Sequence, residues 1–348
     1  MHTEMIPADA PDFGTKVQEL GEIIRNGGLV GFPTETVYGL GGNALDGEAA
    51  KKIYAAKGRP SDNPLIVHVA DKAQAKTIVE SLSPLEERLI DAFWPGPLTL
   101  VMKKKDCIPK ETSGGLSTVA VRCPVHPATQ ALIRAAGVPI AGPSANLSGK
   151  PSPTTAADVL HDLGGRIDAI IDGGPCRIGL ESTIISCAGG RITIYRPGGV
   201  TKEMLEVFAP VTVDRISKDS KEAPKAPGMK YRHYAPSAPM TVYTGDTRKV
   251  KEEILSHAKE AGKTYGYFVS EETAALLPDD AVVFSWGARN DQAAMARSLF
   301  NGLHYFNAHP VDAIIGEGTS ETGIGLAIMN RLTKATGYHI IMEDKGKK

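Results

Sequence analysis

The stretch "EAAKKIYAAKGRPSDNPLIVHVA" (residues 48–70) joins a helical pattern to a buried strand. Its first part carries apolar side chains at helical spacing and closes on Gly58, a typical helix stop. "PLIVHVA" (64–70) is the short apolar run expected of a buried strand. A helix followed by a buried strand is typical of α/β proteins. Between the two lie Lys57, Arg59, Ser61 and Asn63, an unusual density of polar side chains.

The same alternation extends over residues 15–207 and predicts an α/β domain whose sheet is covered by helices. Helices are expected at 16–27, 48–58, 71–80, 83–94, 126–137 and 155–164. Extended segments are expected at 29–40, 64–70, 97–104, 117–124, 138–145, 169–174, 182–188 and 191–198.

A second α/β segment follows from residue 239 to residue 348. Strand patterns at 240–245, 264–270, 281–287 and 311–318 alternate with helical patterns at 250–261, 291–308 and 323–336. This predicts a small, mostly parallel sheet of Rossmann-like type. Residues 208–238 are rich in Pro, Lys and Ser and predict a linker between a 1–207 domain and a 239–348 domain.

Composition restricts the possible functions. Lys and Arg number 39 against 40 Asp and Glu, and this near-neutral balance argues against binding nucleic acid through bulk charge. The N-terminal residues lack a signal-peptide pattern, and no apolar run is long enough to span a membrane. The four cysteines have neither disulfide-framework nor zinc-site spacing, which favours reduced cysteines in a cytoplasmic protein.

Standard catalytic motifs are absent from the sequence. "GPSANLSGKPS" (142–152) has six residues between its glycines, so it is not a Walker phosphate loop. "GLGGNA" (39–44) lacks a helix directly after its glycines, which argues against a nicotinamide cofactor. No nucleophile elbow or carboxylate pair is found.

Three polar clusters remain, all at predicted strand ends or in loops. They are "FPTETVYGLG" (32–41) with "KGRPSDNP" (57–64); "AGPSANLSGKPSPT" (141–154); and "GLESTI" (179–184), "YRPGG" (195–199) and "KYRHYAP" (230–236). Each alone is also consistent with Ser, Asn and Pro building turns. Together with Arg122, their Lys, Arg, Ser, Thr and Asn content favours a phosphate or carboxylate ligand. Because such a site is polar, we expect Lys57 to lie near the surface and not to be needed for the fold.

At these residues the sequence resembles the YrdC-like threonylcarbamoyl-AMP synthases. The resemblance rests on "FPTETVYGLG", the Lys57–Val69 stretch, "PSANLSGKPSPT", and "ESTI" followed by "RPGG"; the linker and the C-terminal segment are similar to the longer, two-domain members. It implies a YrdC-like first domain and a nucleotidyltransferase that converts L-threonine, bicarbonate and ATP into threonylcarbamoyl-AMP and pyrophosphate. That product is used, with other proteins, to make threonylcarbamoyladenosine next to the anticodon of tRNA.

The resemblance also implies roles for individual residues. Lys57 and Arg59 would be catalytic, gripping the phosphates and the carbamate. ATP would be held by these two with Asn63, Thr118, Ser144, Asn146, Ser152, Arg196 and His233. Threonine would lie among Thr36, His68, Arg122 and Ser182. The linker would fold over the site, with Tyr231 and Tyr234 as part of a lid. Magnesium is expected to accompany ATP, without a dedicated protein site.

Two other hypotheses are weaker. An RNA-binding module with a concave basic face is not excluded by the near-neutral total charge, and direct tRNA binding stays open. A carbamoyl-transfer module of the kind found in hydrogenase maturation factors would be accompanied by zinc-finger cysteines, which this sequence lacks.

Overall fold

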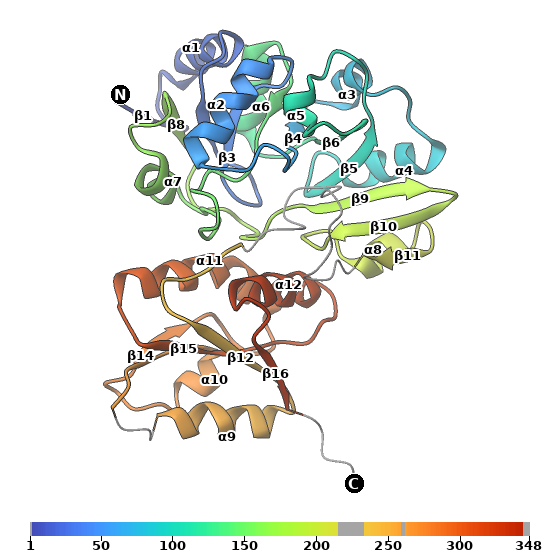
Figure 1. Cartoon of the computed structure of the whole chain (residues 1–348). Helices are drawn as coiled ribbons and strands as arrows, with labels where there is room; N and C mark the ends of the chain where they lie inside the picture. The colour runs from blue at the N-terminus through green and yellow to red at the C-terminus, as the bar shows by residue number, and fades with distance from the viewer. Residues whose placement is uncertain (1, 215–232, 259–261, 344–348) are drawn as a thin grey trace. The chain divides into compact units, whose positions relative to one another are not determined.

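The computed structural model describes residues 2–214, 233–258 and 262–343 (Figure 1). The chain divides into two compact units. The first comprises Met1–Ser148, Ser152–Arg177 and Glu181–Tyr231; the second comprises Gly149–Pro151, Ile178–Leu180 and Arg232–Lys348. The predicted lid residue Tyr231 lies outside the described residues.

The first unit is a mixed α/β structure. Its strands are β1 (Glu4–Pro7), β2 (Val30–Phe32), β3 (Gly39–Asn43), β4 (Ile66–His68), β5 (Leu98–Lys103), β6 (Thr118–Arg122), β7 (Ile140–Ala141), β8 (Ala169–Asp172), β9 (Thr183–Ala188), β10 (Arg191–Arg196) and β11 (Val211–Val213). Its helices are α1 (Phe13–Arg25), α2 (Gly47–Lys57), α3 (Lys72–Ile78), α4 (Pro84–Phe93), α5 (Lys110–Ser113), α6 (Pro127–Ala136), α7 (Ala156–Leu163) and α8 (Lys202–Glu206).

The eleven strands form one sheet in the order β1-β8-β2-β3-β7-β4-β6-β5-β9-β10-β11. Parallel and antiparallel pairs are interspersed: β4 and β6 are parallel, for example, whereas β6 and β5 are antiparallel. On β8, Ile170 packs with α7, while Ala169 and Ile171 pack with α1 and α6. Alternate residues of β8 therefore contribute to two hydrophobic clusters, one on each face of the sheet.

The side chains of β6 also alternate between the two faces of the sheet, but here only one of the faces is mainly apolar. Val119 and Val121 enter the large core that also contains residues of α3 and α4. Thr118, Ala120 and Arg122 therefore share the opposite face. There Ala120 forms a small separate cluster with Ile66 and Ile184. We call this side of β4, β6 and β5 the polar face, because the polar residues Thr118 and Arg122 lie on either side of Ala120 along β6.

The second unit contains a parallel five-stranded sheet. Its strands are β12 (Met240–Gly245), β13 (Tyr265–Val269), β14 (Val282–Ser285), β15 (Ala313–Glu317) and β16 (Ile340–Glu343), in the order β14-β13-β15-β12-β16. The helices are α9 (Thr247–His257), α10 (Glu271–Ala274), α11 (Gln292–Ala308) and α12 (Gly325–Ala335). Helices α9 and α10 cover one face of this sheet, and α11 and α12 cover the other (Figure 1).

The predicted α/β class and the Rossmann-like second sheet are confirmed. Six short elements had no counterpart in the prediction: β1, α5, α8, β11, α10 and β16. Strand β11 lies inside the range predicted to be linker, because its three residues pair in parallel with β10. None of the helices in the described part of the chain combines the length and apolar character needed to cross a bilayer.

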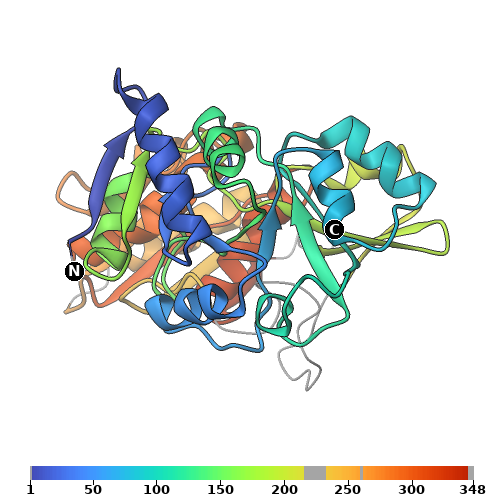
Figure 2. The same ribbon diagram turned by 90° about the horizontal axis from the view of Figure 1, so that it is seen from above.

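Helices α1 and α6 lie side by side and pack against each other (Figure 2). A Cβ atom on Gly21 of α1 would lie 2.5 Å from the carbonyl carbon of Ala135 and 2.7 Å from the nitrogen of Ala136. The Arg25 guanidinium also donates to the Ala135 and Ala136 carbonyls, at 2.9 and 3.0 Å. The absence of a side chain at Gly21 therefore sets the distance between these two helices.

We expect Gly21→Ala to destabilise the first unit by about 1–3 kcal/mol, because the added methyl group has no room between the helices. Gly14→Ala is the matched control on the same helix, since nothing lies within 4 Å of a Cβ there; it should be neutral or stabilising by up to ~1 kcal/mol. Urea unfolding of both variants measures the difference, and equal midpoints would contradict this packing.

Candidate active site

One end of the polar face brings two predicted site residues, His68 and Arg122, to the same level as Thr99. In the sheet register His68 of β4 is opposite Arg122 of β6, and Arg122 is opposite Thr99 of β5. All three are buried. Because the three strands are hydrogen-bonded neighbours, the position of one side chain fixes the positions of the other two.

The Arg122 guanidinium is held by three groups. It donates from Nη2 to the Glu35 carboxylate at 2.6 Å, from Nη1 to the Thr36 hydroxyl at 2.8 Å, and from Nε to the Gly96 carbonyl at 3.3 Å. The side chains of both Arg122 and Glu35 are 4% exposed. Since a guanidinium carries five N–H groups, one N–H remains on each terminal nitrogen. Such a pair of parallel donors suits a carboxylate ligand.

A second network joins Ser182 to the same end of the polar face. The Ser182 and Thr99 hydroxyls are 2.7 Å apart, and Arg196 donates to both the hydroxyl and the carbonyl of Ser182 at 3.1 Å. The Ser152 hydroxyl donates to the buried Glu181 carboxylate at 2.7 Å. Predicted residues from three separate motifs are thereby brought together with Arg122.

Lys57 holds the "PSANLSG" loop. Helix α2 ends at Gly58, whose φ of 61° is left-handed, so Lys57 occupies the last helical position. Its ammonium donates to the carbonyl oxygens of Ser144 and Asn146 and is 2% exposed. Burial and the neighbouring Arg59 guanidinium hold the pKa of Lys57 well below its ordinary value, with Asp162 acting in the opposite direction. One of its three N–H groups is left for a ligand.

The loop that Lys57 holds is also braced from within. The Ser144 hydroxyl donates to the Asn146 side-chain oxygen at 2.6 Å, and Asp162 accepts from the Leu147 N–H at 3.0 Å. Backbone hydrogen bonds of 2.9 Å join Tyr38 to Ala145 and to Pro153. The first and second polar clusters of the sequence therefore lie side by side.

The other end of the polar face carries Thr118. Ile66 is opposite Ala120 in the register, which puts the residues just before β4 level with Thr118. Four residues separate Thr118 from Arg122, which corresponds to about 13 Å along a strand. Thr118 lines a pocket of about 450 Å³ with Lys103, Ser186 and Tyr195.

Arg59 and Asn63 belong to the loop before β4. Arg59 donates to the carbonyls of Asn63 and Pro64 at 3.3 and 3.1 Å and so shapes the loop. The Asn63 side-chain oxygen is buried and has no hydrogen-bond partner among the described residues. A buried acceptor without a partner costs free energy, so it favours a ligand donor at this position.

Two further predicted residues belong to the second unit. The rings of His233 and Tyr234 are 5.4 Å apart, and Tyr234 lies 5.1 Å from Phe300 of α11. Tyr234 is 4% exposed and adopts a left-handed φ of 64°. These contacts place Tyr234 in the core of its own unit; an ATP contact for His233 and a lid role for Tyr234 stay predictions.

Comparison with known proteins identifies the family of this chain. Residues 22–198 match the Sua5/YciO/YrdC family model, described as telomere recombination. Residues 200–337 match a model described as threonylcarbamoyl-AMP synthase, C-terminal domain. The chain belongs to the Sua5/YciO/YrdC family.

Similarity to individual family members extends over nearly the whole chain. The threonylcarbamoyl-AMP synthase of Bacillus subtilis is 47% identical over 328 residues, covering 94% of each chain. That of Pyrococcus abyssi is 47% identical over 331 residues, covering 94% of this chain and 95% of the relative. The crystal structure of P. abyssi Sua5 complexed with L-threonine matches with a TM-score of 0.90 at 44% identity, over 99% of this chain and 100% of that chain.

Sequence reasoning missed several residues of this Sua5-type site. Glu35, Glu181 and Thr99 are buried partners of predicted residues, and half-buried Asp162 holds the loop of Ser144 and Asn146 through the Leu147 N–H. Glu35 and Glu181 stand inside quoted motifs, next to Thr36 and Ser182, but neither forms the carboxylate pair that would signal a catalytic role in the sequence. The expectation that Lys57 lies near the surface is wrong, because its ammonium is enclosed by backbone carbonyls of the next loop.

Magnesium as a companion of ATP stays a prediction. Within residues 2–214, 233–258 and 262–343, no group of three or more His, Cys, Asp or Glu is placed to hold a metal ion. The two buried carboxylates nearest the predicted residues already accept from Arg122 and Ser152.

His68 is buried as a neutral ring. Burial and the Arg122 guanidinium lower its pKa to about 3, while the Ile140 carbonyl, 3.4 Å from Nδ1, favours the protonated form. Between pH 3 and about 6.5 the unfolded chain binds a proton at this histidine and the folded chain does not. Stability should therefore fall as the pH is lowered from 7 toward 3.

We expect His68→Gln to flatten this dependence by up to about 1.4 kcal/mol per pH unit below pH 6, because glutamine takes up no proton. Urea unfolding at several pH values between 5 and 7.5 measures the slope. His161→Gln is the control, since that side chain is 85% exposed and should leave the slope unchanged. Identical slopes for wild type and His68→Gln would rule out a buried neutral His68.

Proposed function

We propose that this protein is an L-threonylcarbamoyladenylate synthase. It forms threonylcarbamoyl-AMP and pyrophosphate from L-threonine, bicarbonate and ATP. One observation carries the conclusion: curated threonylcarbamoyl-AMP synthases match the chain through both units, at 47% identity over 94% of its length. The RNA-binding alternative has no comparable support, because the formal net charge of the chain is -1.

The reaction requires a site that binds two anionic reactants more than it requires a general base. The threonine nitrogen attacks the carbon of carbon dioxide and loses a proton, or attacks the carbon of bicarbonate with loss of water, giving a carbamate in either case. A carbamate oxygen then attacks the α-phosphorus of ATP, and the bond to the departing pyrophosphate breaks with its electron pair. Because the carbamate is already an anion, positioning and charge neutralisation dominate the demands on the protein.

We assign threonine to the Arg122 end of the polar face. The two remaining N–H groups on the terminal nitrogens of Arg122 suit the threonine carboxylate, with Thr36 and Ser182 beside it. Neutral His68 can exchange hydrogen bonds with the ligand without adding a second positive charge. The P. abyssi structure complexed with L-threonine supports a threonine site in this family.

We assign ATP to the loops at the other end of the polar face, near Lys57 and Thr118. Arg59 and the Lys57 ammonium supply positive charge for the phosphates, and Asn63 offers its free acceptor. Ser144, Asn146, Ser152 and Arg196 supply hydroxyl, amide and guanidinium groups for the nucleotide. Mg²⁺ is proposed to enter as part of the MgATP substrate, and His233 to complete the nucleotide site.

The product is proposed to pass to proteins that transfer the threonylcarbamoyl group to tRNA. The acyl-phosphate bond in threonylcarbamoyl-AMP is a mixed anhydride, so an amine can attack its carbonyl carbon with AMP as the leaving group.

A cytoplasmic location is supported by the cysteines, since Cys107, Cys123, Cys176 and Cys187 are all free.

Pyrophosphate release tests the proposed function. It should require threonine, bicarbonate and ATP together, because the carbamate is the nucleophile. Equal release of pyrophosphate without threonine would contradict the proposal.

In the same assay, Arg122→Lys should raise the threonine KM by roughly 10–100-fold and leave the ATP KM within about twofold. Lysine keeps the charge but cannot present two parallel N–H groups. Arg88→Lys is the matched control, because Arg88 is exposed on α4 and bonds only to the Phe208 carbonyl. An equal change in both KM values would show that Arg122 is not specific to threonine.

A further inference from the structure

The second unit has a binding crevice of its own at the carboxyl ends of two central strands. From β12 the chain passes through α9 to β13, on the far side of β15; from β15 it passes through α12 to β16, on the far side of β12. The connections of these adjacent strands therefore leave in opposite directions. In open parallel sheets, ligands bind outside the carboxyl ends of the strands at such a switch point.

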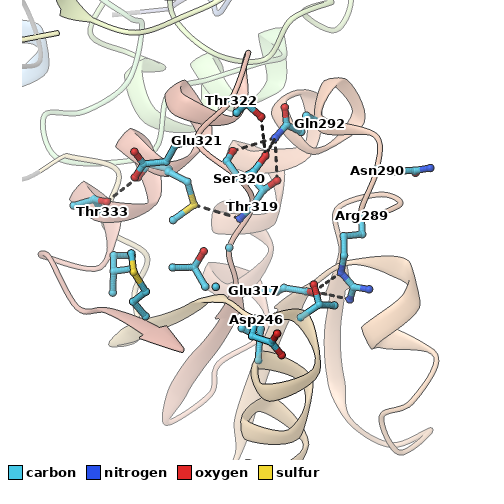
Figure 3. Close-up of a pocket in the computed structure, with 18 of the residues that line it drawn as sticks. Asp246, Arg289, Asn290, Gln292, Glu317, Thr319, Ser320, Glu321, Thr322 and Thr333 are labelled. Atoms are coloured by element: carbon cyan, nitrogen blue, oxygen red, sulfur yellow. Dashed lines mark hydrogen bonds and ion pairs between the residues drawn. The ribbon is translucent and has the colours of Figure 1, made fainter. Parts of the chain in front are cut away.

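A cavity of about 1110 Å³ lies at this switch point (Figure 3). We call it the C-terminal pocket. Its walls are the end of β12 with the start of α9 (244–247), the end of β15 with the loop after it (317–322) and the segment leading into α11 (289–292), with parts of α12 and β16. The cavity is larger than a single amino acid needs and lies slightly above the range of about 300–1,000 Å³ that is usual for small-molecule sites.

Polar contacts join two walls of the pocket. Gln292 of α11 donates to the Thr319 hydroxyl at 3.1 Å and to the Ser320 hydroxyl at 3.0 Å, which holds the loop after β15 in place (Figure 3). Arg289 donates to Glu317 from two nitrogens, at 2.6 and 2.8 Å. These groups come from different elements, so the pocket is preformed and does not depend on one loop.

Other polar groups in the pocket are available to a ligand. Asp246 caps α9 by accepting from the Arg248 and Lys249 N–H groups with one oxygen, and its second oxygen has no partner in the described part of the chain. The hydroxyls of Thr244 and Thr247 also have none there. The Thr319 N–H is met only by the sulfur of Met329, at 3.3 Å, which is a weak acceptor.

Part of the pocket lining is apolar. It consists of Val250, Met329, Tyr338, Ile340 and Met342. Methionine and flat aromatic side chains adapt readily to a planar ring. The pocket thus offers apolar side chains together with a carboxylate, hydroxyls and a backbone N–H.

We propose that the C-terminal pocket binds a nucleoside. Its base would lie against Met329 and Val250, and its ribose hydroxyls would donate to the free oxygen of Asp246, with Thr244 and Thr247 beside them. A carboxylate at the carboxyl end of a parallel strand commonly accepts ribose hydroxyls in Rossmann-like sheets. The lining side chains include three carboxylates and one guanidinium, so the excess negative charge disfavours a triphosphate.

Adenosine binding to the full chain tests this proposal. Isothermal titration calorimetry measures the affinity, and hydrogen–deuterium exchange measured by mass spectrometry locates the site. Adenosine should protect residues 244–250 and 317–329. 2′-Deoxyadenosine should bind roughly tenfold or more weakly, because it lacks one donor to Asp246. Protection confined to 57–63 and 144–152, or no protection, would overturn the proposal.

Two variants separate this pocket from the site on the polar face. Thr333→Trp should fill the cavity and abolish the protection, because Thr333 lines the pocket from α12. Asp246→Asn keeps a good helix cap and should weaken adenosine roughly tenfold. Ser256→Trp, exposed on α9 outside the pocket, is the bulky control and should bind adenosine like wild type. Unchanged protection in both pocket variants would contradict the assignment.

Discussion

The site on the polar face depends on the buried ion pair between Arg122 and Glu35. The guanidinium and the carboxylate are 2.6 Å apart and come from a central strand and from the loop after β2. A charge buried alone would cost several kcal/mol, so each group requires the other. Arg122 also donates to the Thr36 hydroxyl and the Gly96 carbonyl, and the sheet register places His68 and Thr99 beside it.

A buried pair of this kind serves substrate binding as well as folding. Glu35 neutralises part of the Arg122 charge in the absence of substrate, yet it leaves one N–H on each terminal nitrogen of the guanidinium. His68 is kept neutral next to it. In the proposed site, threonine would meet one fixed, oriented cation, and Lys57 and Arg59 would face the phosphates from adjoining loops.

Much of this architecture follows from local pattern. The apolar spacing around Gly58 and the run at 64–70 predicted α2 and β4, and alternation predicted every strand of the second sheet except β16. The polar clusters named the loops that surround Arg122. The sequence did not predict features that depend on residues far away in the chain. Glu35 bonds a residue 87 positions away, and the burial of Lys57 comes from carbonyls 87 and 89 positions away. Strand β11 forms only because β10 offers it an edge.

The second unit shows the same limit of pattern reasoning. Its Rossmann-like sheet was predictable, but the C-terminal pocket draws on three loops that no single motif connects.

The central claim is that this protein joins threonine, bicarbonate and ATP through a carbamate. Mass spectrometry of the product formed with ¹³C-bicarbonate tests it most directly. The account predicts threonylcarbamoyl-AMP that carries the heavy carbon in its carbamoyl group. Unlabelled threonyl-AMP, or AMP and pyrophosphate without any adduct, would contradict it.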